Sequence, residues 1–180
     1  MNTRRDIGLR TVLSVSFLLM IVINVLAEAL PLGGRTTGQV SDSYPNLFSP
    51  AGYTFAIWGL IYLLGALHVL YQLGIFRSRR AEADEKLLAR VAVLFSVSSL
   101  ANAAWAFFWH YDLIALSMLM MLVILSSLAL IMVMLRKKTL ATREKILVRL
   151  PFSVYFGWIT VATIANATTL LVSLGWDRWG

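Results

Sequence analysis

The sequence contains no cysteine and only two histidines, and this excludes several kinds of site at once. Without cysteine there is no disulfide framework, no thiolate nucleophile and no Cys-based metal site. Two histidines do not supply an all-protein transition-metal site either. No HExxH motif and no Ser-His-acid arrangement is visible in the chain. We therefore expect no catalytic residues, no bound metal and no required cofactor.

Charged residues are also scarce. The 180-residue chain is 59% apolar and 14% charged, whereas a soluble domain is typically about 45–50% apolar and about 25% charged. So few charges do not cover a water-soluble globule, and so many apolar residues do not remain disordered. We therefore predict an all-α integral membrane protein.

Five charge-free windows are long enough to cross a bilayer as helices, which takes roughly 20 apolar residues each. Pro45 and Pro50 break the front of the second window, so the helix there begins near residue 51. The prediction is one membrane domain over residues 1–180, a bundle of five transmembrane helices. These spans cover about residues 11–30, 51–76, 91–109, 113–135 and 150–175, with an external loop at 31–50.

The first window also allows a second interpretation. Arg4 and Arg5, an apolar stretch and the A-x-A pattern at Ala27–Ala29 resemble a signal peptide with its cleavage site. However, the charge-free stretch 11–27 is longer than the roughly 7–15 residues of such segments. We expect a retained helix.

The placement of basic residues predicts the orientation. Fourteen of the 16 Lys and Arg residues precede the first span or lie between spans two and three or four and five, while Arg35 and Arg178 lie on the other side. The positive-inside rule then puts the N-terminus in the cytoplasm and the C-terminus outside, in a multi-pass protein of the cell inner (plasma) membrane. Because these bases are shared among three separate segments, we expect membrane lipids as partners and no nucleic acid.

The external loop 31–50 is rich in Gly, Thr, Ser and Pro, a composition typical of irregular backbone. It is too polar to lie in lipid, so it caps the outer mouth of the bundle. Two interpretations stay open, a simple connector and a lid over a cavity. On the other side of the membrane, residues 77–90 are interpreted as a helical extension in which Glu82 and Lys86 pair.

No span carries an acidic or basic residue at mid-depth, since Glu28 and Asp112 lie at outer ends. Proton pumps and ion-coupled transporters usually place such residues inside the membrane. His68 lies within the second span, where a hydrogen-bonded structural role is favoured over a functional one.

Aromatic and amide residues recur at helical spacing, which places them on one face of each helix. The three stripes are Phe55, Trp58, Tyr62 and Gly65; Asn102, Trp105 and Trp109; and Tyr155, Trp158, Ala162 and Asn166. Trp109 and Trp176 lie at span ends and fit an aromatic belt. The deeper tryptophans need partners for their indole N–H groups. Spacing alone favours bundle packing, with the Asn residues as interhelical hydrogen-bonding groups, over a binding pocket.

These stripes carry a family resemblance. Residues 49–62 (SPAGYTFAIWGLIY) resemble the second-helix signature P-P-x-W-x-F-x-x-x-W-x-x-L-Y of the translocator protein family, the tryptophan-rich sensory proteins (TspO/MBR). Residues 102–108 (NAAWAFF) and the Trp158-to-Asn166 spacing resemble its third-helix and fifth-helix patterns. Ser49 and Tyr53 stand where the signature has Pro and Trp, and the fifth-helix Pro-Tyr pair is shifted to Pro151-Phe152, so the chain resembles a divergent member.

The resemblance implies a five-helix bundle, commonly a homodimer, with a cavity near the first external loop. It implies a flat hydrophobic ligand such as protoporphyrin IX, haem, another tetrapyrrole or a sterol-like molecule. The ligand-binding residues carried over by motif are Trp58, Tyr62, Asn102, Trp105, Trp158 and Asn166. The leading hypothesis is a membrane receptor or sensor. The alternatives are a translocator of such ligands, an enzyme that degrades porphyrin in light, and a non-catalytic structural or regulatory subunit in which the tryptophans only pack.

Overall fold

The structure is a computed structural model that describes residues 3–30, 32–76 and 85–176. Every regular element in those ranges is a helix. In chain order they are α1 (Thr3–Ala29), η1 (Leu32–Gly34), α2 (Thr37–Asp42), η2 (Gly52–Ala56), α3 (Ile57–Gln72), α4 (Glu85–His110), α5 (Ile114–Arg136), α6 (Thr142–Glu144), η3 (Lys145–Arg149) and α7 (Leu150–Ser173).

Five stretches of the described chain are long and apolar enough to cross a membrane. They are Ile7–Ala29, Gly52–Gln72, Glu85–His110, Ile114–Arg136 and Thr142–Ser173. This confirms the prediction of an all-α bundle of five transmembrane helices.

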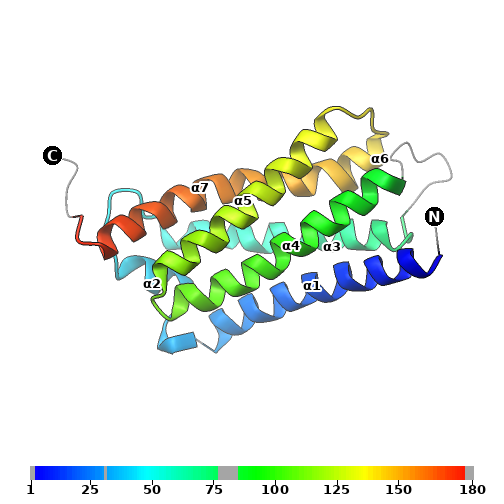
Figure 1. The fold of residues 1–180 in the computed structure, drawn as a ribbon. Coiled ribbons are helices and arrows are strands. Elements are labelled where there is room, and N and C mark those ends of the chain that lie inside the picture. The colour runs from blue at the N-terminus through cyan, green and yellow to red at the C-terminus, as the bar shows by residue number, and fades with distance from the viewer. Residues whose placement is uncertain (1–2, 31, 77–84, 177–180) are drawn as a thin grey trace.

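The five long helices run alongside one another, with α4 in the middle of the bundle (Figure 1). Helix α4 packs against both α1 and α5, and α7 packs against α5 and α3. Helix α1 therefore makes its main contacts with α4 and not with α3, the next long helix along the chain. We call the two ends of the bundle the α2 end and the α6 end.

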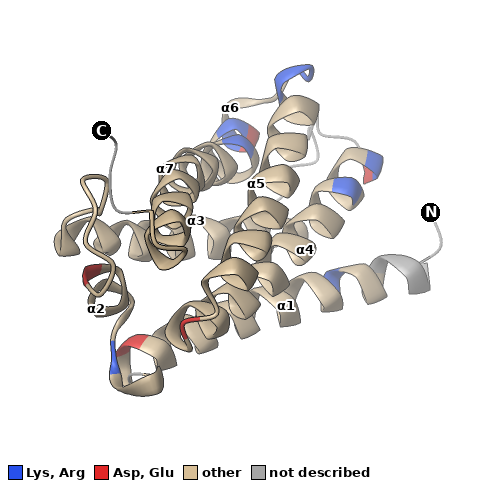
Figure 2. Cartoon of the chain, turned by 60° about the vertical axis from the view of Figure 1, so that its left-hand side comes forward, with Lys and Arg blue, Asp and Glu red and all other residues tan. Residues whose placement is uncertain are grey.

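Charged side chains gather at these two ends. Figure 2 shows Lys, Arg, Asp and Glu near the helix termini, while the lengths between them carry neither colour. Asp42 ends α2 and the paired Arg35 and Asp112 lie at the same end, while Arg136 ends α5 and Arg143 lies in α6. A bilayer removes the water that charges need, so this separation matches a hydrocarbon layer around the middle of the bundle.

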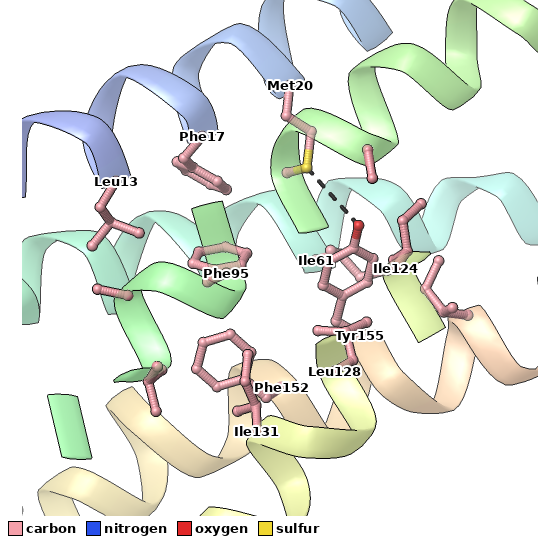
Figure 3. Packing of buried hydrophobic residues seen from close by; sticks show 14 of the residues in the cluster. Leu13, Phe17, Met20, Ile61, Phe95, Ile124, Leu128, Ile131, Phe152 and Tyr155 are labelled. Atoms are coloured by element: carbon pink, nitrogen blue, oxygen red, sulfur yellow. Dashed lines mark hydrogen bonds between the residues drawn. The ribbon is translucent and has the colours of Figure 1, made fainter. Parts of the chain in front are cut away.

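Toward the α6 end, tightly packed aromatic rings fill the core (Figure 3). The ring centroids of Phe95 and Phe152 lie 5.1 Å apart at 85°, and those of Phe17 and Phe95 lie 5.5 Å apart. His68 adds an edge contact to Phe152 at 4.7 Å. Gly65 makes room for this cluster, because a Cβ there would lie 2.7 Å from the Phe17 ring.

His68 is fully buried and hydrogen-bonded, as the favoured structural interpretation predicts. Pro151 has no N–H and so leaves the carbonyl of Leu147, four residues earlier, without its α-helical donor. His68 Nδ1 lies 2.9 Å from that carbonyl oxygen. A carbonyl only accepts, so Nδ1 carries the proton and Nε2 accepts from Gln72 Nε2 at 3.3 Å. Gln72 also donates to Leu88 O, so His68 and Gln72 together tie α3 to η3 and to α4.

Three segments differ in detail from the sequence-based description. The external loop contains a short helix, α2, which begins with a reciprocal capping box between Thr36 and Gln39. At the α6 end the last span begins with α6 and a π-helical turn, and Glu144 there is buried and accepts from Tyr71 Oη at 2.9 Å. Helix α4 begins at Glu85, while residues 77–84, including Glu82 of the predicted pair with Lys86, lie outside the described residues.

Candidate ligand-binding site

A small cavity lies at the α2 end of the bundle, where the aromatic stripes of α3, α4 and α7 converge. Its volume is about 30 Å³, enough for water but far below the roughly 300–1,000 Å³ of sites for drug-sized ligands. The lining residues are Thr37, Ser41, Pro50, Phe55, Trp58, Trp105, Trp109, Trp158, Ala162, Ala165 and Asn166. Four of the six residues predicted to bind ligand are among them, namely Trp58, Trp105, Trp158 and Asn166.

Trp58 lies at the centre of the aromatic cluster. Its ring centroid is 6.2 Å from that of Trp158 at 84° and 6.3 Å from that of Trp105 at 33°. Tyr155 presents an edge contact at 6.0 Å. Edge-to-face and offset pairs at such distances are the favoured arrangements of aromatic rings. The cluster joins three helices, so it both packs the bundle and forms apolar walls for a flat molecule.

Trp105 and Asn166 are joined by a complete hydrogen-bond network. Trp105 Nε1 donates to Asn166 Oδ1 at 2.9 Å, and Asn166 Nδ2 donates to Ser117 Oγ at 3.1 Å. These bonds link α4, α7 and α5 and satisfy the indole N–H that a buried Trp must place. Within the structure as described, Asn166 borders the cavity with an amide that is already engaged.

Asn102 and Tyr62 do not line the cavity. Asn102 accepts from Asn24 Nδ2 at 2.7 Å and donates to Tyr155 Oη at 3.1 Å, so it joins α1, α4 and α7. Tyr62 stacks on Trp58, with ring centroids 5.7 Å apart at 23°. Both residues lie behind the cavity wall and pack against or hydrogen-bond to residues beside it. The bonds of Asn102 fit the interhelical hydrogen bonding predicted for it.

Trp158 differs from the other cavity tryptophans. Its Nε1 atom is buried and has no hydrogen-bond partner among the described residues. A buried donor without an acceptor costs about 1–3 kcal/mol, so Trp158 is a lining residue whose N–H still lacks a hydrogen bond. Phe55 stands edge-on to the Trp158 ring at 6.1 Å.

Residues 32–50, which we call the cover, close the cavity at the α2 end. Thr37 and Ser41 of α2 and Pro50 contribute to its lining, as expected for a lid. Trp109 Nε1 donates to Thr37 O at 3.2 Å, and Thr37 N–H donates to Glu28 Oε1 at 3.0 Å. The assignment of Trp109 to an aromatic belt is therefore wrong. Its side chain is buried, because the cover supplies the acceptor that a belt tryptophan takes from the interface.

An ion pair holds the cover against the turn between α4 and α5. Arg35 pairs with Asp112 and also donates to Ser43 Oγ at 3.2 Å, while Tyr44 Oη donates to Asp112 Oδ1 at 3.0 Å. We call Arg35, Tyr44 and Asp112 the latch. Burial, followed by the bond to Asp112, raises the pKa of Tyr44 above its ordinary value, so the phenol remains a donor at neutral pH.

The close approach of the cover also requires a glycine. Gly33 has φ +63°, and a Cβ there would lie 2.7 Å from the backbone oxygen of His110. Gly34 has φ +80° as well, yet a Cβ there would meet nothing within 4 Å. Contact with the end of α4 thus depends on Gly33 in particular.

Sequence reasoning missed part of the site. Ser41, Thr37 and Pro50 come from a polar loop whose fold has no strong sequence signal, although the lid interpretation pointed to it. Phe55, Trp109 and Ala162 lie in the predicted stripes but are not among the six residues predicted to bind ligand. Ala165 lies outside the stripes, and its position next to Asn166 is the signal that could have found it.

Comparison with known proteins gives one match. A family model described as TSPO-like protein matches residues 10–180, a range that contains the whole cavity lining. No curated protein and no solved structure matches the chain.

Proposed function

Because the chain belongs to the TSPO-like protein family and is a multi-pass membrane protein, we propose that it is a receptor or sensor for a flat hydrophobic molecule. The proposed ligand is a tetrapyrrole such as protoporphyrin IX or haem, or a molecule of sterol-like shape. The observation that carries this proposal is the cavity bordered by Trp58, Trp105 and Trp158, with the buried, unpartnered Nε1 of Trp158 beside it.

The chemistry of the lining supports such a ligand. The lining consists of aromatic rings, alanines, a proline, two hydroxyl groups and one amide, and it has no titratable side chain. Aromatic walls stack on a flat apolar molecule, and a few polar groups fix its orientation. An acceptor on the ligand would take the Trp158 N–H. Arg35, an obvious donor for the propionates of a porphyrin, would have to leave Asp112 to reach them.

Binding requires the cavity to enlarge, since about 30 Å³ does not hold a macrocycle. The cover is the element that can move at least cost, because its ion pair is partly exposed and its helices are short. We infer that ligand enters as the latch opens and the cover withdraws. Ligand binding would thereby change the exposed surface at the α2 end, which is what a sensor needs.

Transport of the ligand is the second hypothesis, and the packing at the α6 end weighs against it. A translocator needs a state open to the opposite side. Here Phe17, Phe95, Phe152 and His68 fill that side with ring contacts of 4.7–5.8 Å. Opening a path would disrupt this cluster, whereas opening the cover would not.

Protoporphyrin IX titration in the dark tests the proposal, with detergent-purified protein and tryptophan quenching as the readout. We expect saturation near one ligand per chain. Because an aromatic pair contributes about 0.5–1.5 kcal/mol, Trp58→Phe and Trp158→Phe should each weaken the apparent Kd roughly 2- to 10-fold. Trp176→Phe is the matched control, since Trp176 is exposed and outside the cavity.

Linear quenching that is equal in all four proteins would mean partition into micelles and would overturn the tetrapyrrole assignment. Repeating the absorbance scan after illumination separates binding from light-dependent degradation. A sterol titration of the same variants by competition distinguishes a porphyrin site from a site for any flat apolar ligand.

A further inference from the structure

The end of the cover and the residues that directly follow it present apolar side chains to the outside. Within residues 45–53, which we call the 45–53 segment, Leu47 is fully exposed, Tyr53 is 82% exposed and Phe48 is 43% exposed. No charged residue occurs between Asp42 and Arg77. Scattered exposed apolar residues are ordinary, but three gathered in an uncharged segment indicate an apolar contact surface.

The backbone of this segment is held by its own hydrogen bonds. Asn46 Oδ1 accepts from the Phe48 N–H at 2.9 Å, and Asn46 Nδ2 donates to Tyr44 O at 2.9 Å. The Thr54 hydroxyl donates to the carbonyl of Ala51. Several backbone groups of the segment are thus satisfied locally, while Leu47 and Phe48 remain outside the core. These bonds reduce the number of backbone groups that need water, and a position at the membrane interface leaves water available to the others.

The exposed surface continues onto a lipid-facing helix. Tyr53, Ala56, Leu60 and Leu63 follow one another at steps of three, four and three, so they lie on one face, and all four are exposed. Leu60 and Leu63 lie in a stretch apolar enough to span the membrane. Figure 1 places the 45–53 segment at the α2 end, shortly before α3 begins. The segment therefore continues the exposed apolar face of α3 toward the N-terminal end of the stretch that can span the membrane.

We propose that the 45–53 segment, in contrast to the polar first half of the loop 31–50, is an interfacial anchor that inserts into the lipid leaflet at the α2 end. Leu47 and Phe48 enter the boundary between headgroups and acyl chains, and Tyr53 lies at headgroup level, where Tyr is favoured. Pro50 of the same segment lines the cavity. The cover is then held at two places, by the bilayer beside α3 and by the latch beside α4. The anchor does not depend on which ligand the cavity takes.

Single-cysteine labelling tests this proposal directly, because the chain has no cysteine of its own. An environment-sensitive fluorophore is attached in Leu47→Cys, in Asp42→Cys and in Leu60→Cys. Asp42 is an exposed cover residue outside the segment, and Leu60 is the lipid-facing reference. The proteins are placed in phosphatidylcholine nanodiscs with one chain per disc, with and without nitroxide on the lipid acyl chains.

The expected result is a blue-shifted emission for the probe at position 47 and a loss of intensity with nitroxide lipid similar to that at position 60. The probe at position 42 should keep its emission in water and resist quenching. Emission at position 47 equal to that at position 42 would overturn the proposal. A blue shift at position 47 that appears only with several chains per disc would overturn the proposal and indicate contact with a second copy. A blue shift that appears only after native membrane extract is added would overturn it and indicate a protein partner.

Discussion

Asp112 occupies a backbone position that usually selects glycine. Helix α4 ends in a Schellman motif, in which Leu113 N–H donates to Phe108 O at 2.9 Å and Asp112 has φ 56°. Aspartate tolerates this left-handed conformation better than most residues do, though less well than glycine. The carboxylate that results is the centre of the latch. Aspartate at position 112 thus has a less favourable backbone conformation than glycine would have, but it provides the contact with the cover.

Substitutions of Asp112 test the contribution of the latch without changing the turn. Asp112→Gly keeps the turn and removes the ion pair, so the cover should open more often. Ser41→Cys, a buried cavity residue, then serves as the sole thiol, and its alkylation rate reports opening. The partly exposed ion pair contributes about 0.2–1 kcal/mol and the hydrogen bond from Tyr44 to Asp112 a similar amount, so we expect the alkylation rate to rise on the order of 2- to 30-fold.

Salt provides the control for this measurement. Screening weakens an exposed ion pair, so added NaCl should speed alkylation in the protein that retains Asp112 and leave the Asp112→Gly protein unchanged. Asp112→Asn should lie between the two, since the amide accepts from Tyr44 but does not pair with Arg35. Equal rates in all three proteins, insensitive to salt, would show that the latch does not hold the cover.

His68 and Pro151 form a pair that a double-mutant cycle can resolve. His68→Leu removes the donor to the part-buried Leu147 carbonyl, which should cost about 1–3 kcal/mol. In a Pro151→Ala background the N–H gained at position 151 can take that carbonyl, so the same change should cost less. SDS-induced unfolding in mixed micelles measures both costs. Strict additivity would contradict the role assigned to Pro151.

The two tryptophans at span ends differ in a way that residue-level prediction did not anticipate. Trp176 is exposed after the last helix, and its place in an aromatic belt stays a prediction, whereas Trp109 is buried under the cover. Their sequence environments are alike, since each follows an apolar run. The difference comes from the carbonyl of Thr37, 72 residues earlier in the chain, and spacing within one helix does not contain such a contact.

At the scale of helices, Gly65 sets how closely α3 approaches α1 and α4. Gly65→Ala would place a Cβ 2.7–2.8 Å from the Phe17 ring, and Phe17 is itself confined by Phe95. Overpacking costs about 1–3 kcal/mol, while Ala gains about 1 kcal/mol over Gly in a helix. The net expectation is a lower midpoint of thermal unfolding in detergent.

Gly59→Ala is the matched control, since a Cβ at that position of the same helix meets nothing within 4 Å. Its midpoint should stay the same or rise, because only the helix propensity changes. A fall of equal size in both variants would mean that glycine is needed for the flexibility of α3 and not for its approach to Phe17.

The long helices could be predicted from sequence because hydrocarbon tolerates so few charges. Charge-free runs and their flanking residues were sufficient to number the five spans and to place them along the chain. The short elements could not be predicted in this way. The π-helical turn at Lys145–Arg149 adjoins the buried Glu144 and Pro151 in sequence, but the donor to its Leu147 carbonyl is His68 from another helix. The cavity likewise could not be predicted from the sequence, because it forms only where the three aromatic stripes and the cover pack together.

The whole molecule has an electrical asymmetry that predicts its orientation. Lys and Arg are concentrated at the α6 end, while Asp42 and Asp112 accompany Arg35 at the α2 end (Figure 2). By the positive-inside rule the α6 end should face the cytoplasm. An impermeant thiol reagent should therefore label Asp42→Cys in intact cells and Lys137→Cys only after permeabilisation, since both positions are exposed. The reverse pattern would invert the proposed topology.

The pairing of α1 with α4 has a consequence for biosynthesis. Residues 30–84 separate the two helices, so at roughly 5–20 residues per second α1 waits several seconds in the bilayer before its partner is synthesised. During that time Asn24 faces lipid without Asn102. Its Nδ2 group, however, also donates to Met20 O of the same helix at 2.8 Å. The nascent helix can thus satisfy this amide within itself until α4 has been synthesised and inserted.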